Sequence, residues 1–247
     1  EKMMIQYCTN CVLPSCKPVT AKEAEKKTAS ATSTINFEDG VCEACRWNLI
    51  KDNSIDWRKR EIELETLLDR FRSSDGSYDV IVPASGGKDS VYVSHILKHK
   101  YGMTPLTVTW SPSLWTQQGR RNQENLIKSG FDNVLISPNG EIHRLLTKLA
   151  FTKLGHPFQP FIFGQRSVGP KMALKHNVRL VFYGENVAEY GNPLEENYNP
   201  QMDVNLFTTY NIKDPKTMLA GHTIDELDVN FKIKQNDLNA YNPPNQS

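Results

Sequence analysis

Between residues 78 and 184, short apolar segments alternate with segments of helical spacing. The apolar segments have the length of β-strands and lie at Asp79–Pro83, Pro105–Thr109, Asn133–Ser137 and Arg179–Gly184. The helical segments lie near 88–101, 117–129, 140–154 and 167–177. Such alternation predicts an α/β fold, a parallel doubly wound sheet with helices on both faces. In these sheets, ligands bind beyond the carboxyl ends of the strands.

A glycine pair follows the first of these predicted strands. The strand Val80-Ile81-Val82 leads through a proline into SGGKDS at residues 85–90, and a helical segment follows directly. Two glycines let backbone N–H groups approach a ligand closely, and the positive end of the helix favours an anion. Ser85 and Ser90 can add hydroxyl donors, whereas Asp89 suits a phosphate only with a divalent cation between them. We therefore expect a phosphate site with Mg²⁺; an ordinary strand–helix turn is the alternative.

All five cysteines lie between residues 8 and 45. Four of them form two C-x-x-C pairs: Cys8, Cys11, Cys42 and Cys45. Four thiolates satisfy a tetrahedral Zn²⁺ and leave no open position, which describes a structural site. Free or redox-active thiols are the alternative, and Cys16 is a spare thiol or a substitute ligand. The middle of the spacer, residues 17–34, is polar and predicts a mobile loop.

The composition limits the kinds of binding partner and the cellular location that we expect. The chain has 247 residues and a net charge of +1, which predicts no general attraction to nucleic acid or to anionic membranes. No segment approaches the ~20 apolar residues of a membrane span, and the first residues lack the apolar core of a signal peptide. We expect a cytoplasmic protein that binds neither membranes nor nucleic acid.

Two segments lie outside the alternating region. Residues 56–72 place leucines at helical spacing, which predicts an amphipathic helix with Asp56 as its N-cap. After about residue 192 the chain is rich in Asn, Pro, Asp and Tyr. There we expect a short helix at Ile224–Val229 and a loose ending from Asn239 onward.

The SGGKDS stretch resembles the SGGxDS signature of the PP-loop ATP pyrophosphatases. It lacks the spacing of the Walker loop and of the dinucleotide-binding fingerprint. Enzymes of the PP-loop superfamily split ATP between the α- and β-phosphates and adenylylate a carbonyl oxygen, after which a nucleophile displaces AMP. Lys88 occupies the variable position of the signature and adds a positive charge.

The whole chain resembles the N-acetyl sugar amidotransferase family of bacterial surface-polysaccharide, lipopolysaccharide and nonulosonic-acid pathways. The matching stretches are YCTNCVLP, INFEDGVCEAC, IDWRKREIELETLL, SGGKDS, PLTVTW, GHPFQPFIFGQ and VFYGENVAEYGNP. They run from residue 7 to about 193 in the family's order. Two features depart from the family: the spacer between the C-x-x-C pairs is long, and the chain stops early. We expect part of the substrate domain to be absent or rebuilt.

The resemblance implies the activity and the partners. The chain would use ATP and Mg²⁺ to convert the N-acetyl group of a sugar, carried on a nucleotide, into an acetamidino group. Ammonia would come from a separate glutamine amidotransferase subunit. The implied organisation is a zinc-binding module at 1–55, a PP-loop ATP-binding domain at 56–192 and a substrate-side extension at 193–247. The sugar, its carrier and a homo-oligomeric state stay open.

The resemblance also assigns roles to residues. The ATP site would comprise Ser85, Gly86, Gly87, Lys88, Asp89, Ser90, Thr109, Trp110 and Gly184. The substrate would contact His156, Gln165, Asn186 and Glu189, and catalysis would use Lys88, Asp89 and Glu185. The alternatives are strand-end packing for Thr109 and Trp110, a helix-capping turn at 184–186, and a structural His156. The cluster Phe158-Phe161-Phe163 is expected in the core.

Two other functions compete with this one. A tRNA-modifying PP-loop enzyme of the thiolase type would also combine zinc cysteines with an ATP site. The absence of cysteines after Cys45 and the small net charge weigh against it. A non-catalytic nucleotide-binding subunit is the second alternative, and the early end of the chain motivates it.

Overall fold

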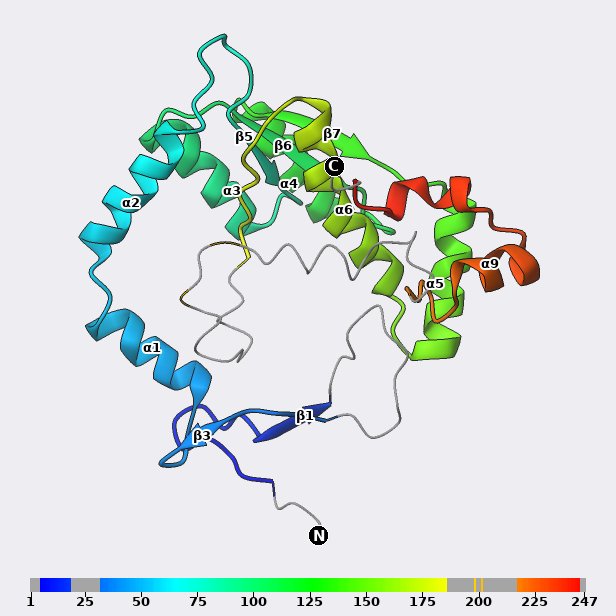
Figure 1. Cartoon of the computed structure of the whole chain (residues 1–247), viewed down its shortest axis with the longest axis horizontal. Coiled ribbons are helices and arrows are strands. Elements are labelled where there is room, and N and C mark those ends of the chain that lie inside the picture. The colour runs from blue at the N-terminus through cyan, green and yellow to red at the C-terminus, as the bar shows by residue number, and fades with distance from the viewer. Residues whose placement is uncertain (1–4, 19–31, 186–197, 199–200, 202–216, 245–247) are drawn as a thin grey trace. The chain divides into compact units, whose positions relative to one another are not determined.

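The computed structural model describes residues 5–18, 32–185, 198, 201 and 217–244. The chain divides into two compact units (Figure 1). The cysteine unit comprises Glu1–Glu23, Lys27–Ile62 and Asn186–Asp203, and the sheet unit comprises Ala24–Lys26, Glu63–Glu185 and Val204–Ser247.

The cysteine unit contains two small antiparallel ribbons and a helix. Strands β1 (Cys16–Pro18) and β2 (Thr32–Thr34) pair, and so do β3 (Phe37–Glu38) and β4 (Val41–Cys42). Asp39 and Gly40 join β3 to β4 with positive φ angles of 50° and 78°, as a tight two-residue hairpin requires. Helix α1 follows at Glu43–Asn53. Residues 19–31, most of the spacer predicted to be mobile, lie outside the described residues.

Helix α2 (Trp57–Asp69) confirms the predicted amphipathic helix. The Asp56 carboxylate accepts the backbone N–H of Lys59 at 3.0 Å, which confirms the predicted N-cap. Leu68 is fully buried, and Leu64 packs against the same core. The leucine stripe therefore anchors the second half of this helix, from Glu63 onward, in the sheet unit.

The sheet unit is built on three parallel strands. They are β5 (Val80–Pro83), β6 (Pro105–Trp110) and β7 (Asp132–Ile136), in the order β5-β6-β7. These strands lie within one residue of the predicted bounds at every end. The architecture is α/β with a three-stranded parallel sheet, whereas the doubly wound PP-loop type stays a prediction.

The predicted fourth strand at Arg179–Gly184 is reduced to a single parallel bridge between Val181 and Ile81. Ile81 donates its N–H to Leu180 O at 2.9 Å, and Phe182 donates its N–H to Ile81 O at 2.8 Å. The next donor along β5 would be Pro83, which has no N–H. The ladder therefore cannot continue, and the prediction of a full strand is wrong.

Helices cover both faces of this sheet. Helix α3 (Lys88–His95), its π-helical continuation η1 (Ile96–Lys100) and α2 pack against Val80 and Val82. Helices α5 (Gly140–Leu154) and α6 (Gln159–Lys175) pack against Ile81, Leu106 and Val108 on the opposite face. Helix α4 (Gln117–Lys128) buries Leu126 beside Ala84.

Helix α6 begins at Gln159, eight residues before the predicted start. Pro160 lies in its first turn, where the missing N–H is harmless, and Pro170 lies inside it. The early start also divides the predicted aromatic cluster. Phe163 is buried, Phe161 packs at the edge of the core, and Phe158 is 65% exposed, so the core prediction is wrong for Phe158.

The C-terminal residues belong to the core of the sheet unit. Helix α9 (Ile224–Phe231) confirms the predicted short helix and begins with a capping box of Thr223 and Glu226. A 3₁₀ helix, η3 (Gln235–Tyr241), follows, and Tyr241 is only 1% exposed. The expected loose ending is therefore wrong as far as Asn242, which is also buried.

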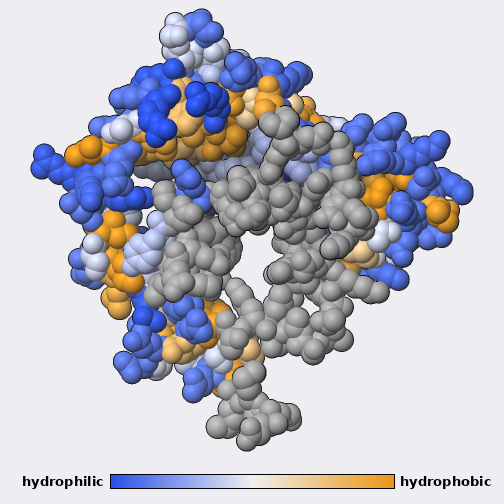
Figure 2. All heavy atoms as spheres, viewed as in Figure 1, coloured by the Kyte–Doolittle hydropathy of each residue, from blue (hydrophilic) through white to orange (hydrophobic). Residues whose placement is uncertain are grey.

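Within the described ranges, no helix is both long enough and apolar enough to cross a membrane. Figure 2 shows apolar residues in separate patches between hydrophilic ones on the described part of this face.

Candidate functional site

The four paired cysteines converge in the cysteine unit. Their sulfur atoms all lie within 4.8 Å of one another. The Cys11 and Cys42 sulfurs are 3.5 Å apart, and those of Cys8 and Cys45 are 3.9 Å apart. Four sulfurs at zinc–thiolate bond length would be about 3.8 Å apart around a tetrahedral ion. The cluster therefore has the size and the ligands to hold a metal such as zinc.

Backbone N–H groups prepare one of these thiols for metal. Burial acts to raise the pKa of Cys8, but backbone N–H groups around its sulfur, first that of Cys42, lower it to about 6. Burial raises the pKa of Cys42 and of Cys45. Metal binding requires all four thiolates and would supply the missing stabilisation of charge. Cys16 lies on β1, outside the cluster.

In the sheet unit, the SGGKDS stretch forms a tight loop between β5 and α3. Gly86 has φ of +76°, and a Cβ there would lie 3.1 Å from the backbone nitrogen of Gln123 on α4. Gly87 is the N-cap of α3 and provides no side-chain cap. The start of α3 therefore receives no side-chain cap from its N-cap residue, and helix N-termini of this kind favour anions.

The side chains of the loop project from this turn. Lys88 Nζ lies 2.6 Å from Asp89 Oδ1, and both side chains are largely exposed. Ser85 and Gly87 are exposed as well, whereas Ser90 donates its hydroxyl to Gly87 O at 3.2 Å. The carboxylate of Asp89 and the amine of Lys88 thus form an exposed ion pair at the mouth of the loop.

The segment after Val181 closes the other side of the loop. A Cβ at Gly184 would lie 2.9 Å from the backbone nitrogen of Ser90, so the two backbones touch at the start of α3. Glu185 follows and is exposed. The structure thus brings Gly184 and Glu185 to the loop. Asn186 and Glu189 lie outside the described residues.

Thr109 and Trp110, predicted to border adenosine, are both buried. Thr109 donates its hydroxyl to the carbonyl of Ala84 at 2.6 Å, directly beneath the loop. Trp110 packs so closely on α6 that a Cβ at Gly164 would lie 2.1 Å from its ring. Neither side chain is open to a nucleotide in this conformation; Trp110 belongs to the core and Thr109 to the support of the loop.

The predicted substrate residues His156 and Gln165 belong to the region around the start of α6. Gly164 of α6 touches Trp110 at the carboxyl end of β6, and His176, just after α6, touches Tyr78 ahead of β5. Helix α6 therefore runs antiparallel to the strands, and its first turns lie toward their carboxyl ends. The Nε2 atom of His156 is buried and has no hydrogen-bond partner among the described residues.

Two polar groups near this edge escaped the sequence reasoning. Burial raises the pKa of Tyr183 to about 12, and its buried hydroxyl has no partner among the described residues. The side chain of His143 joins Ser113 Oγ at 3.1 Å to Tyr241 Oη at 2.9 Å. Tyr183 directly precedes Gly184 and Glu185 in the sequence, and this position could have marked it as a candidate site residue. The histidine link joins residues up to 98 positions apart, which no local pattern reveals.

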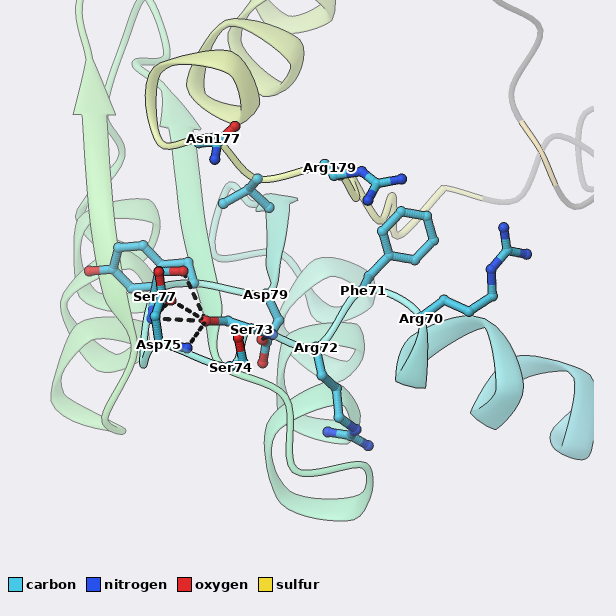
Figure 3. A pocket seen from close by; sticks show the side chains of 12 residues that line it. Arg70, Phe71, Arg72, Ser73, Ser74, Asp75, Ser77, Asp79, Asn177 and Arg179 are labelled. Carbon is cyan, nitrogen blue, oxygen red and sulfur yellow. Dashed lines mark hydrogen bonds between the residues drawn. The ribbon is translucent and has the colours of Figure 1, made fainter.

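A pocket of about 230 Å³ lies at the opposite edge of the sheet, around the residues that lead into β5 (Figure 3). Arg70, Phe71 and Arg179 form one side, and the guanidinium of Arg179 lies 5.4 Å from the centre of the Phe71 ring. Ser73 and Asp75 form the other side. This pocket precedes β5, whereas the glycine loop follows it, so the two sites are separate.

Comparison with known proteins gives little further information. No protein-family model matches the chain. Over 102 residues the chain is 29% identical to an uncharacterized protein of Methanocaldococcus jannaschii, and the match covers 41% of this chain. The match spans about a third of that relative's length, 36%. The relative's name assigns no activity, so the likeness carries no function.

Proposed function

We propose that the chain is an ATP-dependent amidotransferase that converts the N-acetyl group of a sugar into an acetamidino group. The observation that carries the proposal is the position of the glycine loop. From β5 the chain proceeds to β6 and β7 on one side, and later returns to the other side of β5 at Val181. Such a reversal of strand order is where α/β sheets of the doubly wound type bind ligands.

The residues at this point fit ATP with Mg²⁺. The positive N-terminal end of α3, whose N-cap Gly87 has no side chain, and the glycine pair would favour phosphate oxygens. The exposed carboxylate of Asp89 would hold Mg²⁺ against those oxygens, and Lys88 would add a second positive charge. The metal would neutralise the charge that develops on the leaving pyrophosphate.

The proposed reaction has two steps. The amide oxygen of the N-acetyl group bonds to the α-phosphorus of ATP, and pyrophosphate leaves while the loop N–H groups hold it. Ammonia then attacks the imidate carbon, and the carbon–oxygen bond breaks so that the oxygen leaves with AMP. Glu185, exposed beside the loop, would accept a proton from the attacking ammonia. We expect ammonia from a separate glutaminase and locate the protein in the cytoplasm.

The cysteine cluster favours a second candidate, a tRNA-modifying PP-loop enzyme, because such enzymes also pair zinc cysteines with an ATP site. A net charge of +1 provides little of the attraction that tRNA phosphates need. The two candidates predict different triggers for AMP release: an N-acetyl sugar for the amidotransferase, and tRNA for its rival.

The test incubates the chain with ATP, Mg²⁺, ammonium and a panel of N-acetyl sugars labelled with heavy oxygen in the amide. We expect a product lighter than the unlabelled sugar by one dalton and the label in AMP. Asp89→Asn should lose most turnover, whereas Asp75→Asn, an exposed aspartate before β5, should keep it. Label in free phosphate with ADP would overturn the mechanism, and label retained in the sugar would overturn the amidotransferase.

A further inference from the structure

A network of buried polar side chains lies beneath the glycine loop. Thr109 Oγ1 donates to the carbonyl of Ala84 at 2.6 Å. The same oxygen accepts Asn133 Nδ2 at 2.9 Å and Gln123 Nε2 at 3.2 Å. Gln123 Nε2 also donates to Asn133 Oδ1 at 2.8 Å. Three elements, β6, α4 and β7, thereby converge on one hydroxyl group.

Burial leaves this network little choice of arrangement. Thr109 is 1% exposed and Gln123 is 6% exposed. A hydroxyl group has one donor and two acceptor positions, and all three positions of Thr109 are used. Because a buried polar group without a partner costs free energy, rotation of any one of these side chains would be penalised. The Ala84 carbonyl, at 2.6 Å, is a much closer acceptor for the Thr109 hydroxyl than Gln123 Oε1, at 3.4 Å, and so favours the O–H direction toward Ala84.

Ala84 is the residue at which the chain leaves the sheet. Its N–H donates to Val108 O at 2.8 Å, and its carbonyl accepts the Thr109 hydroxyl, so β6 holds both sides of this residue. Ser85 and Gly86 follow directly, and Gly86 has already turned to a φ of +76°. The orientation of Ala84 therefore sets the direction in which the loop N–H groups point.

Helix α4 supports the loop at a second point. The backbone of Asn122 and Gln123 would lie 3.1–3.2 Å from a Cβ at Gly86, so the helix touches the loop directly. The side chain of Gln123 reaches the loop again through Thr109. One residue of α4 thus contacts the loop with its backbone and supports it with its side chain.

We propose that Thr109, Gln123 and Asn133 are positioning residues of the ATP site. They do not touch the nucleotide; they hold the Ala84 peptide so that the following N–H groups are aimed at the phosphates before ATP arrives. This role rests on the proposed function, and it replaces the predicted contact of Thr109 with adenosine by an indirect one.

Two threonines of β6 make a matched test. Thr107 is also fully buried, and its hydroxyl also donates at 2.6 Å to a backbone carbonyl, that of Asp132 in β7. The Thr107 hydroxyl accepts Asn133 Nδ2 at 2.9 Å as well, and in Thr107→Val this amide should keep its bond to Thr109 Oγ1. Thr109→Val and Thr107→Val each remove one such hydroxyl and keep the shape of the side chain. Both should lower the unfolding temperature by comparable amounts. Only the first leaves the Ala84 carbonyl without its donor.

The first readout is ATP binding by calorimetry. Thr109→Val should raise the dissociation constant for ATP about tenfold, the size of one hydrogen bond. Thr107→Val should stay within about twofold of the wild type, and Thr109→Ser, which restores the hydroxyl, should do the same. Equal ATP affinity of the two valine variants would overturn the positioning role.

The second readout needs no nucleotide. Hydrogen exchange of the peptide that contains residues 85–88 should be faster in Thr109→Val than in Thr107→Val, because only the former releases the loop. If the wild type binds no ATP but this difference appears, the proposed function fails and the support of the loop by Thr109 stands. If both variants exchange alike in this peptide, the network does not position the loop, whether or not ATP binds.

Discussion

The cysteine cluster and the glycine loop are two candidate sites built on opposite principles. In the cluster, the binding atoms are the sulfurs of four side chains that come from the turn at residues 8–11 and from the start of α1. In the proposed loop site, the binding groups are mainly backbone N–H groups. The sequence reveals these groups only indirectly, through the two glycines at positions 86 and 87. The chemistry of a site made of side chains can be read directly from the residue types in the sequence. A site made of backbone depends on what holds the backbone in place.

The two regions also differ in what stabilises them. Among the described residues of the cysteine unit, the buried apolar core consists of Cys8, Ile35 and Cys42, with a few partly buried neighbours. Two of these three residues are metal ligands in the proposed site. The loop instead lies on a sheet whose two faces are both covered by apolar residues. We therefore expect the cysteine unit to need its ligand in order to fold, and the loop to be formed without one.

The largest effect should follow removal of the metal. Structural zinc contributes about 10–16 kcal/mol to the folding of small modules, far more than so small a core can replace. Chelation or Cys42→Ser should abolish the hydrogen-exchange protection of residues 32–53 and leave residues 80–90 protected. Cys16→Ser, outside the cluster, should change neither region.

Elemental analysis completes this test. We expect one zinc per chain in the wild type and in Cys16→Ser. Iron in place of zinc, or no metal at all, would reject the zinc assignment. Loss of protection at residues 80–90 after chelation would break the comparison itself, because the loop would then depend on the cysteine unit.

The next effect tests whether the loop is a backbone site. Gly184→Ala would place a Cβ 2.9 Å from the backbone nitrogen of Ser90 and push the start of α3 aside. We expect a loss of about 1–3 kcal/mol in unfolding free energy and at least tenfold weaker ATP binding. Gly140→Ala, with no atom within 4 Å of the added Cβ, should leave both unchanged. Normal ATP affinity in Gly184→Ala would remove this contact from the site.

The same distinction explains which parts of the fold the sequence could predict. Strong local patterns gave the helix at Gly140–Leu154 and the strand at Pro105–Trp110 almost to the residue. The fourth strand failed because its pairing depends on Pro83, a residue in another strand that lacks an N–H. Helix α6 was predicted too short at its start, where Pro160 resembles a helix breaker unless its position in the first turn is known.

For the sites, the sequence identified the cysteines and the loop but not the support of the loop. The rule that ligands bind at strand ends placed Thr109 near the nucleotide. Neighbouring strand residues point to opposite faces, however, and whether a face is covered depends on the helix above it. Gln123 and Asn133 belong to no motif, and only the fold brings them to Thr109.

The pH dependence of the unfolding free energy should contain a contribution from the sheet unit that is independent of the metal site. Burial lowers the pKa of His143 below its usual 6.5, so the unfolded chain binds this proton more tightly than the folded chain. Its contribution to stability is complete above pH 6.5 and decreases as the pH falls from there toward the lowered pKa, by at most about 1.4 kcal/mol per pH unit. The ring faces Ser113 and Tyr241, and burial raises the pKa of Tyr241.

The measurement compares urea unfolding of the wild type and His143→Phe between pH 7 and pH 5.5. The variant keeps a ring at this position but cannot titrate, so its stability should change less with pH. Zinc release would affect both proteins alike and cancels in the difference. Equal slopes for the two proteins would show that His143 titrates normally in the folded chain.

The smallest expected effect tests whether ATP binding at the loop depends on the N-terminal end of α4. Thr116 is the N-cap of α4, and its hydroxyl accepts the N–H of Gly119 at 2.9 Å. Thr116→Ala should cost about 1 kcal/mol of unfolding free energy, and Thr116→Ser should restore most of it. The cap lies about two helical turns before Gln123, so ATP affinity should stay within about twofold of the wild type. Suppose instead that Thr116→Ala weakened ATP binding as much as Thr109→Val. Then the loop would respond to the position of the whole helix, and the contact between Thr109 and Ala84 would be only one part of a broader support.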